Sequence, residues 1–293
     1  MANGWRTVVI DKRCKLDYRL GYLRFRTEFE EKSIFLDEVA VLLVEEVGVS
    51  LTCYLLQELT NRKIKVIFCD SKRNPFSELQ SLYGSFDTSK KYEMQLSWKA
   101  ETKAKVWQEI IRQKILSQRE LLIKIGKKDK ADLLRSYAND VRDGDSTNRE
   151  GMAAKVYFRA LFGDNFNRDD VENHINSFLD YGYTLLNSLF NRSVCTCGYA
   201  TQLGIWHSGG QNPFNLSSDL MEPFRPVIDQ HIRLVKSQVL DSSTKHFILR
   251  AFDERVRIIG SFQTLLNAVP IWVASVFDAL NNDDVGLIKK YEL

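Results

Sequence analysis

One stretch of the chain combines the side chains that metal-dependent chemistry uses. The segment HSGGQNPFNLSSDLMEPFRP, residues 207–226, begins with His207, continues through a Gly-, Asn-, Pro- and Ser-containing loop, and includes Asp219 and Glu222. Because these two acids are three residues apart, they project from one face if the segment is helical. An imidazole and carboxylates that converge could bind a divalent metal ion, which would need a further carboxylate from a separate element.

The same residues also fit ordinary structural roles, and the sequence leaves both interpretations open. Asp219 could cap the start of a helix, with Glu222 as its capping-box partner three residues later and Ser217 and Ser218 as a polar approach. His207 could equally be a loop or core histidine. The metal interpretation therefore depends on a partner carboxylate elsewhere in the chain.

The best candidate for that carboxylate is Glu150, in the segment DSTNREGMAAKVYFRALFG. The preceding DGDST predicts a loop, so Glu150 falls in the first turn of the following helix, where an acid is also favourable without any ligand. The small residues 151–154 would let a bulky ligand come close. Oxygen ligands suit Mg²⁺ or Mn²⁺, and one imidazole favours tolerance of Mn²⁺.

Sequence patterns predict a β-rich region ahead of these residues. RTVVI, GYLRFRT and SIFLDEVAVLLVE are typical of strands, and KVIFCD is typical of a buried strand. Ser50 is expected to cap a helix over LTCYLLQELTNRK. The Gly-, Ser-, Pro- and charge-containing stretches DSKRNPF and LYGSFDTSKK predict a linker.

Beyond Glu93 the apolar residues repeat with the period of a helix almost without interruption. The segment WKAETKAKVWQEIIRQKILSQRELLIKIG is one long amphipathic stretch, and further helical segments follow it. We therefore predict an α+β protein of two domains. Residues 1–85 would form a small β-rich domain, and residues 86–293 a larger all-α domain that carries the candidate ligands.

Composition places the chain among ordinary globular proteins. With 293 residues, 44% hydrophobic and 27% charged, it is long enough to bury a sizeable core. Its most apolar run is interrupted by Glu45 and Glu46, and its first residues lack a hydrophobic signal core, so we expect a cytoplasmic protein with no membrane span. The five scattered cysteines are expected to be reduced thiols.

Several classes of enzyme are disfavoured because their motifs are missing. The sequence has no Gly-rich phosphate loop, no G-x-S-x-G and no H-E-x-x-H, and only four histidines. Few residues could therefore act as a protein nucleophile. Metal-dependent phosphodiester chemistry remains possible, because it draws its nucleophile from water or from a nucleic-acid hydroxyl.

Positive charge is concentrated in one predicted helical region. Between Lys99 and Lys130 there are ten Lys or Arg residues and four acids. Such an excess could neutralise the phosphates of a nucleic acid, or it could be a solvated helix face. The overall charge of +3 does not decide between them.

Four segments carry a resemblance to a known family. EGMAAKVYFRALFG (150–163), INSFLDYGYTLLNS (175–188), GIWHSGGQNPFNLSSDLMEPFRPVIDQ (204–230) and VIFCDSKRNPF (66–76) closely resemble the CRISPR adaptation integrase. This is the universal subunit that inserts new spacers into CRISPR arrays. The chain is most similar to the shorter form that accompanies single-protein effector nucleases, as in type II systems.

The resemblance implies a metal site and a supporting carboxylate. Its ligands would be Glu150, His207 and Glu222, binding Mg²⁺ or Mn²⁺, and many members carry aspartate at the position of Glu222. Asp219, one turn earlier, matches a family carboxylate that would support the ligands from behind. The β-rich domain, residues 1–85, would serve dimerisation and partner contacts.

The resemblance also implies an activity and partners. The 3′-hydroxyl of a captured double-stranded DNA fragment would attack a phosphodiester at the edge of a CRISPR repeat. The protein would act as a homodimer with a small ferredoxin-like adaptation subunit and, in addition, the effector nuclease. The residues expected to contact DNA are Arg149, Arg225, Lys99, Lys103, Arg112, Lys127 and Lys128.

Two alternatives to this activity remain open at the level of sequence. The same ligands would serve an endonuclease that cleaves branched DNA with water as the nucleophile. The protein could also be a non-catalytic DNA-binding scaffold in which the three residues cap helices or belong to the core.

Overall fold

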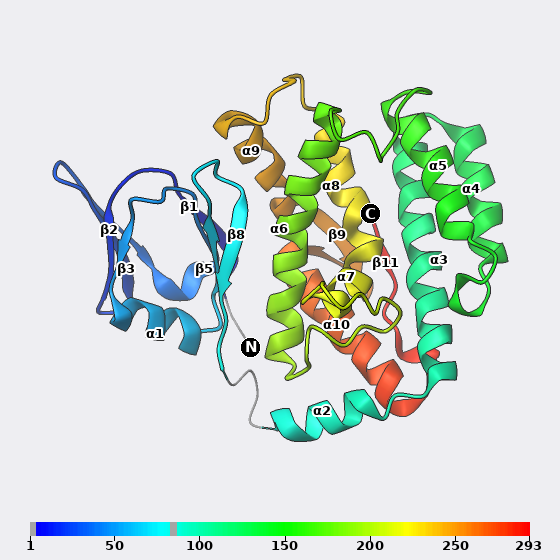
Figure 1. Ribbon diagram of the computed structural model, residues 1–293, viewed down its shortest axis with the longest axis horizontal. Coiled ribbons are helices and arrows are strands. Elements are labelled where there is room, and N and C mark those ends of the chain that lie inside the picture. Colours follow the sequence, from blue (N-terminus) through cyan, green and yellow to red (C-terminus); the bar gives the residue numbers. More distant parts are fainter. Residues whose placement is uncertain (1–3, 83–86) are drawn as a thin grey trace. The chain divides into compact units, whose positions relative to one another are not determined.

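The chain divides into two compact units, Met1–Gly84 and Ser85–Leu293. The structure is a computed structural model and describes residues 4–82 and 87–293 (Figure 1). The predicted domain boundary, between residues 85 and 86, lies outside the described residues. The units are therefore described one at a time.

The N-terminal unit is built from two four-stranded sheets and a helix. Parallel pairing joins β1 to β5 and β5 to β7, with antiparallel β8 at the edge of this sheet, and the second sheet has the order β4-β3-β2-β6. β5 reads VAVLLV and is buried throughout, as expected of a central parallel strand covered on both faces. The elements are β1 (Arg6–Ile10), β2 (Lys15–Arg19), β3 (Tyr22–Arg26), β4 (Glu31–Phe35), β5 (Val39–Val44), β6 (Ser50–Leu51), α1 (Cys53–Asn61), β7 (Lys65–Cys69) and β8 (Pro75–Leu79).

Two predictions for this unit are wrong in detail. Ser50 does not cap α1, because it belongs to strand β6, and the cap is Thr52, whose hydroxyl accepts a hydrogen bond from the backbone N–H of Leu55 at 3.2 Å. The stretch DSKRNPF is a turn into strand β8, with the Asp70 carboxylate accepting from the backbone N–H of Asn74 at 2.9 Å. Short polar side chains stabilise tight turns in this way, so a polar stretch need not be a linker. The strands predicted from RTVVI, GYLRFRT and KVIFCD are confirmed.

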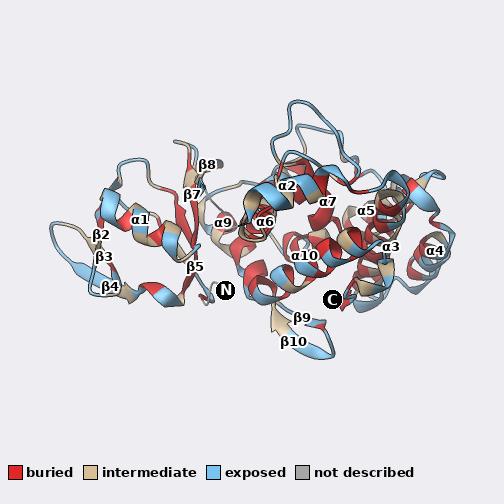
Figure 2. Ribbon diagram, turned by 90° about the horizontal axis from the view of Figure 1, so that it is seen from below, coloured by how far each residue is buried: buried red, intermediate tan, exposed pale blue. Residues whose placement is uncertain are grey.

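The C-terminal unit is mainly helical, and its longest helix, α3, packs against α4 and α5 (Figure 1). A second group forms around α6, which packs against α7, α8 and α10. Buried residues run along α6, α7 and α10 in Figure 2. No helix in the described ranges is long and apolar enough to cross a membrane. The elements are α2 (Thr88–Leu96), α3 (Ala100–Lys124), α4 (Lys128–Asp140), α5 (Arg149–Phe162), α6 (His174–Thr196), α7 (Asn215–Met221), α8 (Arg225–Ile232), α9 (Ser242–Leu249), β9 (Arg255–Ile258), β10 (Ser261–Thr264), α10 (Leu265–Asn282) and β11 (Tyr291–Glu292).

The prediction that this unit is all-α is wrong. Strands β9, β10 and β11 form an antiparallel sheet in the order β10-β9-β11. Along β9 exposed and buried residues alternate, with Val256 and Ile258 buried, which is the two-residue period of a strand. Ile259 and Gly260 both have positive φ, at 50° and 72°, which suits the two-residue turn that joins β9 to β10.

Candidate active site

Glu150 lies in the first turn of α5, as predicted, and a set of polar side chains fixes the start of that helix. Asn148 adopts a left-handed conformation, and its side-chain oxygen accepts from the N–H of Gly151 at 3.2 Å. The Asp145 carboxylate accepts from the N–H groups of Arg149 and Glu150 at 2.8 and 3.0 Å. These acceptors satisfy N–H groups that have no partner within the helix, so the backbone at Glu150 is held firmly.

Gly151 has a different role from the predicted one. A Cβ atom at this position would lie 2.6 Å from the side-chain oxygen of Asn148. The absence of a side chain therefore makes room for the helix cap. We expected this glycine to make room for a ligand, but the space it leaves is taken by the Asn148 side chain.

Glu222 lies where α7 ends and a short 3₁₀ helix, Glu222–Phe224, leads into α8. α7 begins at Asn215, so Asp219 and Glu222 are at its C-terminal end, and the alternative in which they form a capping box is wrong. The Glu222 side chain is almost fully buried, and Arg225 contacts its Oε1 at 2.8 Å. A buried carboxylate of this kind needs compensating positive charge.

Lys114, on α3, joins the two acids. Its Nζ lies 2.5 Å from Glu150 Oε1 and 2.5 Å from Glu222 Oε2, and the lysine is buried. Carboxylates from two separate helices therefore converge on a single cation. This geometry brings two of the three predicted metal ligands together.

In this cluster, burial and the neighbouring charges shift each pKa in opposite directions, and the charges have the larger effect. Burial by itself would raise the pKa of Glu222, but the positive charges of Arg225 and Lys114 lower it to about 2. Burial would lower the pKa of Lys114, but attraction to Glu222 and Glu150 outweighs it, so that pKa is raised. Both groups are therefore ionised near neutral pH.

Asp219 holds His207 and the loop around it. Its buried carboxylate accepts from the backbone N–H groups of Ile205 and Trp206 at 2.7 and 2.8 Å, and it contacts Nδ1 of His207. The hydrogen bond with Asp219 raises the pKa of His207 against the opposing effect of burial, and the charges of Glu222 and Glu150 add to it. With Nδ1 engaged, Nε2 is the nitrogen left to bind a ligand.

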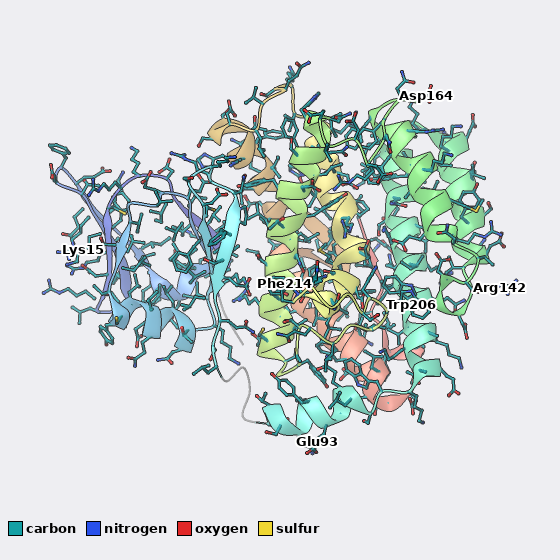
Figure 3. All side chains as sticks on the ribbon, in the orientation of Figure 1. Lys15, Glu93, Arg142, Asp164, Trp206 and Phe214 are labelled. Atoms are coloured by element: carbon teal, nitrogen blue, oxygen red, sulfur yellow. The ribbon has the colours of Figure 1, made fainter. Side chains whose placement is uncertain are left out.

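Trp107, on α3, fixes the orientation of this loop. Its ring is parallel to that of Trp206, with centroids 6.1 Å apart and 6° between planes, and it meets the His207 ring edge to face at 5.4 Å. Figure 3 shows Trp206 on the loop between α6 and α7, close to α3. A cavity of about 560 Å³ adjoins His207 and is lined by this loop together with Trp98 and Lys103.

Glu150, Glu222 and His207 are side chains of the kinds that bind a divalent cation. In this structure the Lys114 ammonium lies between the two glutamates. Among residues 4–82 and 87–293, no three His, Cys, Asp or Glu side chains are arranged to hold a metal ion. Glu150 and Glu222 instead share Lys114, and Glu222 Oε2 makes no hydrogen bond of good geometry despite that close ammonium. Two carboxylates and one imidazole are suitable ligands for Mg²⁺ or Mn²⁺.

The arginines expected to contact DNA are already engaged within the protein. Arg225 pairs with Glu222, and its guanidinium lies 4.4 Å from the centre of the Tyr183 ring. Arg149 lies 3.7 Å from Asp140 and stacks over Tyr137. Arg225 therefore belongs to the cluster around Glu222, whereas the ion pair and the ring contact of Arg149 are with α4.

The remaining predicted DNA contacts do not share one environment. Lys99 is paired with Asp283, and Arg112 lies 3.4 Å from Glu109. Lys103 lines the cavity beside His207, Lys127 lines a different cavity, and Lys128 is exposed at the start of α4. The predicted basic track is thus divided among several surfaces of the unit.

A second polar group near the cluster has no direct signal in the sequence. Asp229, on α8, is buried and accepts hydrogen bonds from the hydroxyl of Tyr157 at 2.7 Å and of Tyr183 at 2.5 Å. It joins α5, α6 and α8, four residues after Arg225. A signal for Lys114 does exist, because it follows Ile110 and Ile111 at helical spacing and so lies on the apolar face of α3.

Comparison with known proteins gives one consistent family. The family model "CRISPR associated protein Cas1" matches residues 7–252. A curated relative, the CRISPR-associated endonuclease Cas1 of Neisseria meningitidis serogroup C, is 34% identical over 99% of this chain and 96% of its own length.

Two solved structures show the same fold at low sequence identity. A casposase bound to its integration product has a TM-score of 0.75 at 16% identity and covers 96% of this chain and 93% of its own. A Cas6-RT-Cas1–Cas2 complex has a TM-score of 0.75 at 17% identity, covering 100% of this chain and 36% of its own.

Proposed function

Since this chain belongs to the Cas1 family of CRISPR-associated proteins, we propose that it is a metal-dependent DNA integrase that inserts short DNA fragments into a CRISPR array. The observation that carries the proposal is the convergence of Glu150 and Glu222 on one cation, beside a histidine held by Asp219. The similarity of the fold to a casposase bound to an integration product supports strand transfer over simple cleavage.

In this proposal Glu150, His207 and Glu222 would hold Mg²⁺ or Mn²⁺, and the two acids would exchange their contacts with Lys114 for the ion. The ion would stabilise charge on the phosphoryl oxygens and on the attacking and leaving oxygens. Asp219 keeps the imidazole oriented through Nδ1. Arg225 keeps Glu222 in position. Lys114 would supply a further positive charge beside the two acids.

The proposed reaction exchanges one phosphodiester bond for another. The 3′-hydroxyl of the incoming fragment loses its proton and bonds to the phosphorus at the edge of a repeat, and the displaced 3′-oxygen gains a proton. Because the bond formed and the bond broken are of one kind, no nucleotide hydrolysis is needed. This agrees with the absence of a phosphate loop from the sequence.

The proposed partners include the one that a similar structure names, together with others implied by the family resemblance. One similar structure is a complex that contains Cas1 and Cas2, so we propose that this protein also assembles with a small adaptation subunit, with a ferredoxin-like fold. A homodimer formed through the N-terminal unit, transient association with the effector nuclease, and a cytoplasmic location complete the proposal.

A joining assay tests the proposed reaction. Purified protein and its adaptation subunit are mixed with a labelled duplex that has free 3′-hydroxyl ends and a plasmid that carries the repeat, with MgCl₂, MnCl₂ or EDTA. We expect covalently joined product only with metal. Glu150→Gln and Glu222→Gln should each lower the rate on the order of 10²–10³-fold, whereas Glu172→Gln, an exposed acid remote from the cluster in sequence, should not.

The alternatives make different predictions in the same assay. A branched-DNA endonuclease would cleave the plasmid or a branched substrate with metal but would join nothing. A non-catalytic scaffold would bind DNA, and neither glutamate variant would change the products. Undiminished joining by both variants would overturn the assignment of the ligands.

A further inference from the structure

The C-terminal half of α5 borders a second cavity that is rich in positive charge. This cavity has a volume of about 640 Å³ and lies where α3 ends, α4 begins and α5 ends, near Asp164, which Figure 3 labels. Five Lys and Arg side chains line it, and Asp164 is the only acid among its lining residues. We call the group the basic pocket, and its cations are Lys127, Lys130, Lys155, Arg159 and Arg233.

These cations are exposed, and no partner for them lies in the part of the chain that the structure describes. Within residues 4–82 and 87–293, none of the five forms an ion pair or a side-chain hydrogen bond. Other cations of the same unit, such as Lys99, Arg149 and Arg225, are each paired with an acid. Like charges gathered around one hollow repel one another, and an anion in the hollow relieves that repulsion.

The backbone around the basic pocket also favours an anion. Lys127 is the N-cap of α4 and makes no side-chain cap hydrogen bond, so N–H groups of the first turn of that helix are not capped by it. Helix N-termini carry partial positive charge and bind phosphate through such groups. Gly163 lines the same cavity, and a Cβ atom there would have no neighbour within 4 Å, so this wall is open.

A purely structural explanation covers only one of the five cations. Arg159 lies in the last turn of α5, where a positive charge interacts favourably with the C-terminal end of the helix dipole. Lys155 lies in the middle of the same helix, Lys127 and Lys130 lie at the unfavourable end of α4, and Arg233 follows α8. The dipole therefore does not account for their convergence.

The basic pocket is separate from the cluster around Glu150. At a rise of about 1.5 Å per residue, Arg159 lies roughly 14 Å along α5 from Glu150. At about 100° per residue, the Lys155 and Arg159 side chains also leave α5 on the side opposite Glu150. An anion in the pocket would therefore not be the reacting phosphate.

We infer that the basic pocket binds the phosphodiester backbone of DNA outside the reacting bond, as a second anchoring site. The inference builds on the proposed DNA-binding function. The pocket joins Lys127 and Lys130, at the start of α4, with two cations of α5 and with Arg233, which follows α8. Phosphate recognition by flexible, unpaired cations contributes affinity but little sequence preference.

Binding measured without catalysis tests this inference. Fluorescence anisotropy with a labelled duplex of about 30 base pairs is recorded in EDTA over a range of salt concentrations, with the full-length protein. Lys155→Glu/Arg159→Glu should weaken binding on the order of tenfold and reduce the magnitude of the salt slope by about two, because about two phosphate contacts are lost. Lys289→Glu, an exposed lysine between α10 and β11, is the control for a single charge reversal and should leave the slope nearly unchanged.

A second variant on another element guards against misfolding. Lys127→Glu/Lys130→Glu places acids at the start of α4, where they favour the helix, so thermal unfolding should be unimpaired while DNA affinity falls as before. Wild-type affinity and slope in both double variants would overturn the inference.

A second titration tests whether the ligand of the basic pocket is DNA or a free polyphosphate. Inorganic triphosphate is titrated into wild type and each double variant by calorimetry. If the double variants lose triphosphate binding yet bind DNA like wild type, the assignment to DNA is wrong. Since EDTA removes any metal-dependent joining, these outcomes do not depend on whether the proposed integrase reaction occurs.

Discussion

Lys114 is the residue that organises the candidate active site in the present arrangement. Its buried ammonium lies between Glu150 and Glu222, two carboxylates that would otherwise repel each other in a poorly solvated place. A lysine in this position does what a divalent cation would do, with fewer charges. It therefore keeps the acids together and, in the proposed function, would compete with a metal ion for them.

Replacing Lys114 should reveal this competition. Lys114→Met leaves two buried acids without their shared cation, so without metal the free energy of unfolding should fall by about 3–5 kcal/mol. Addition of MnCl₂ should then raise the melting temperature of the variant more than that of wild type, because binding to the folded state stabilises it. Differential scanning calorimetry with EDTA or MnCl₂ measures both effects.

The matched control for Lys114→Met lies on the same helix. Lys105 is exposed on α3, so Lys105→Met should leave both the stability and the metal-induced increment close to those of wild type. An equal increment in wild type and Lys114→Met would contradict a shared position for ammonium and metal.

At the level of secondary-structure elements, close helix packing places the residues of the cluster. A Cβ atom at Gly182 of α6 would lie only 2.4 Å from Cγ2 of Ile228 on α8, so these helices touch where a side chain would not fit. α8 begins at Arg225, and its Asp229 bonds to Tyr183 of α6. The α6–α8 contact therefore fixes the helix that follows Glu222.

An added methyl group should force these helices apart. We expect Gly182→Ala to lower the free energy of unfolding by about 1–3 kcal/mol, the usual cost of overpacking a close-packed core. Gly210→Ala is the control, because nothing lies within 4 Å of the added Cβ, and it should change stability by less than about 1 kcal/mol. Urea unfolding gives both values, and equal effects would show that the contact can relax.

For the molecule as a whole, buried titrating groups rather than the small net charge of +3 should control the pH dependence of stability. Burial raises the pKa of Asp229 to about 6, although the hydroxyls of Tyr183 and Tyr157 act in the opposite direction. Between the ordinary aspartate pKa of 3.8 and about 6, the folded state therefore holds a proton that the unfolded state has lost. Its contribution to stability is complete below the lower value and is lost as pH rises through the upper one.

Asp229→Asn should remove this pH dependence. Relative to the variant, wild type should lose about 2 kcal/mol of stability between pH 4 and pH 6 and show a nearly constant difference above about pH 7. The asparagine carbonyl can still accept a tyrosine hydrogen bond, which keeps the comparison close. Parallel curves for the two proteins across this range would mean that Asp229 is ionised throughout.

The sequence by itself determined the elements whose pattern is local. The β-branched residues of RTVVI and the long amphipathic stretch that became α3 need only their own residues to be recognised, and so does Glu150 in the first turn of a helix. Family resemblance added Glu150, His207 and Glu222 as a proposed ligand set. The β9–β10 hairpin was missed because strands of four residues give little periodic signal.

Only the tertiary structure decided which charges meet. Glu150, Glu222 and Lys114 come from three different helices, and the cations of the basic pocket come from three segments, so no spacing along the chain encodes these contacts. Asp219 also looked like a helix cap until the fold placed the backbone of the 205–207 loop around its carboxylate. Electrostatic interactions depend on distance and burial, and the packing of remote segments sets both.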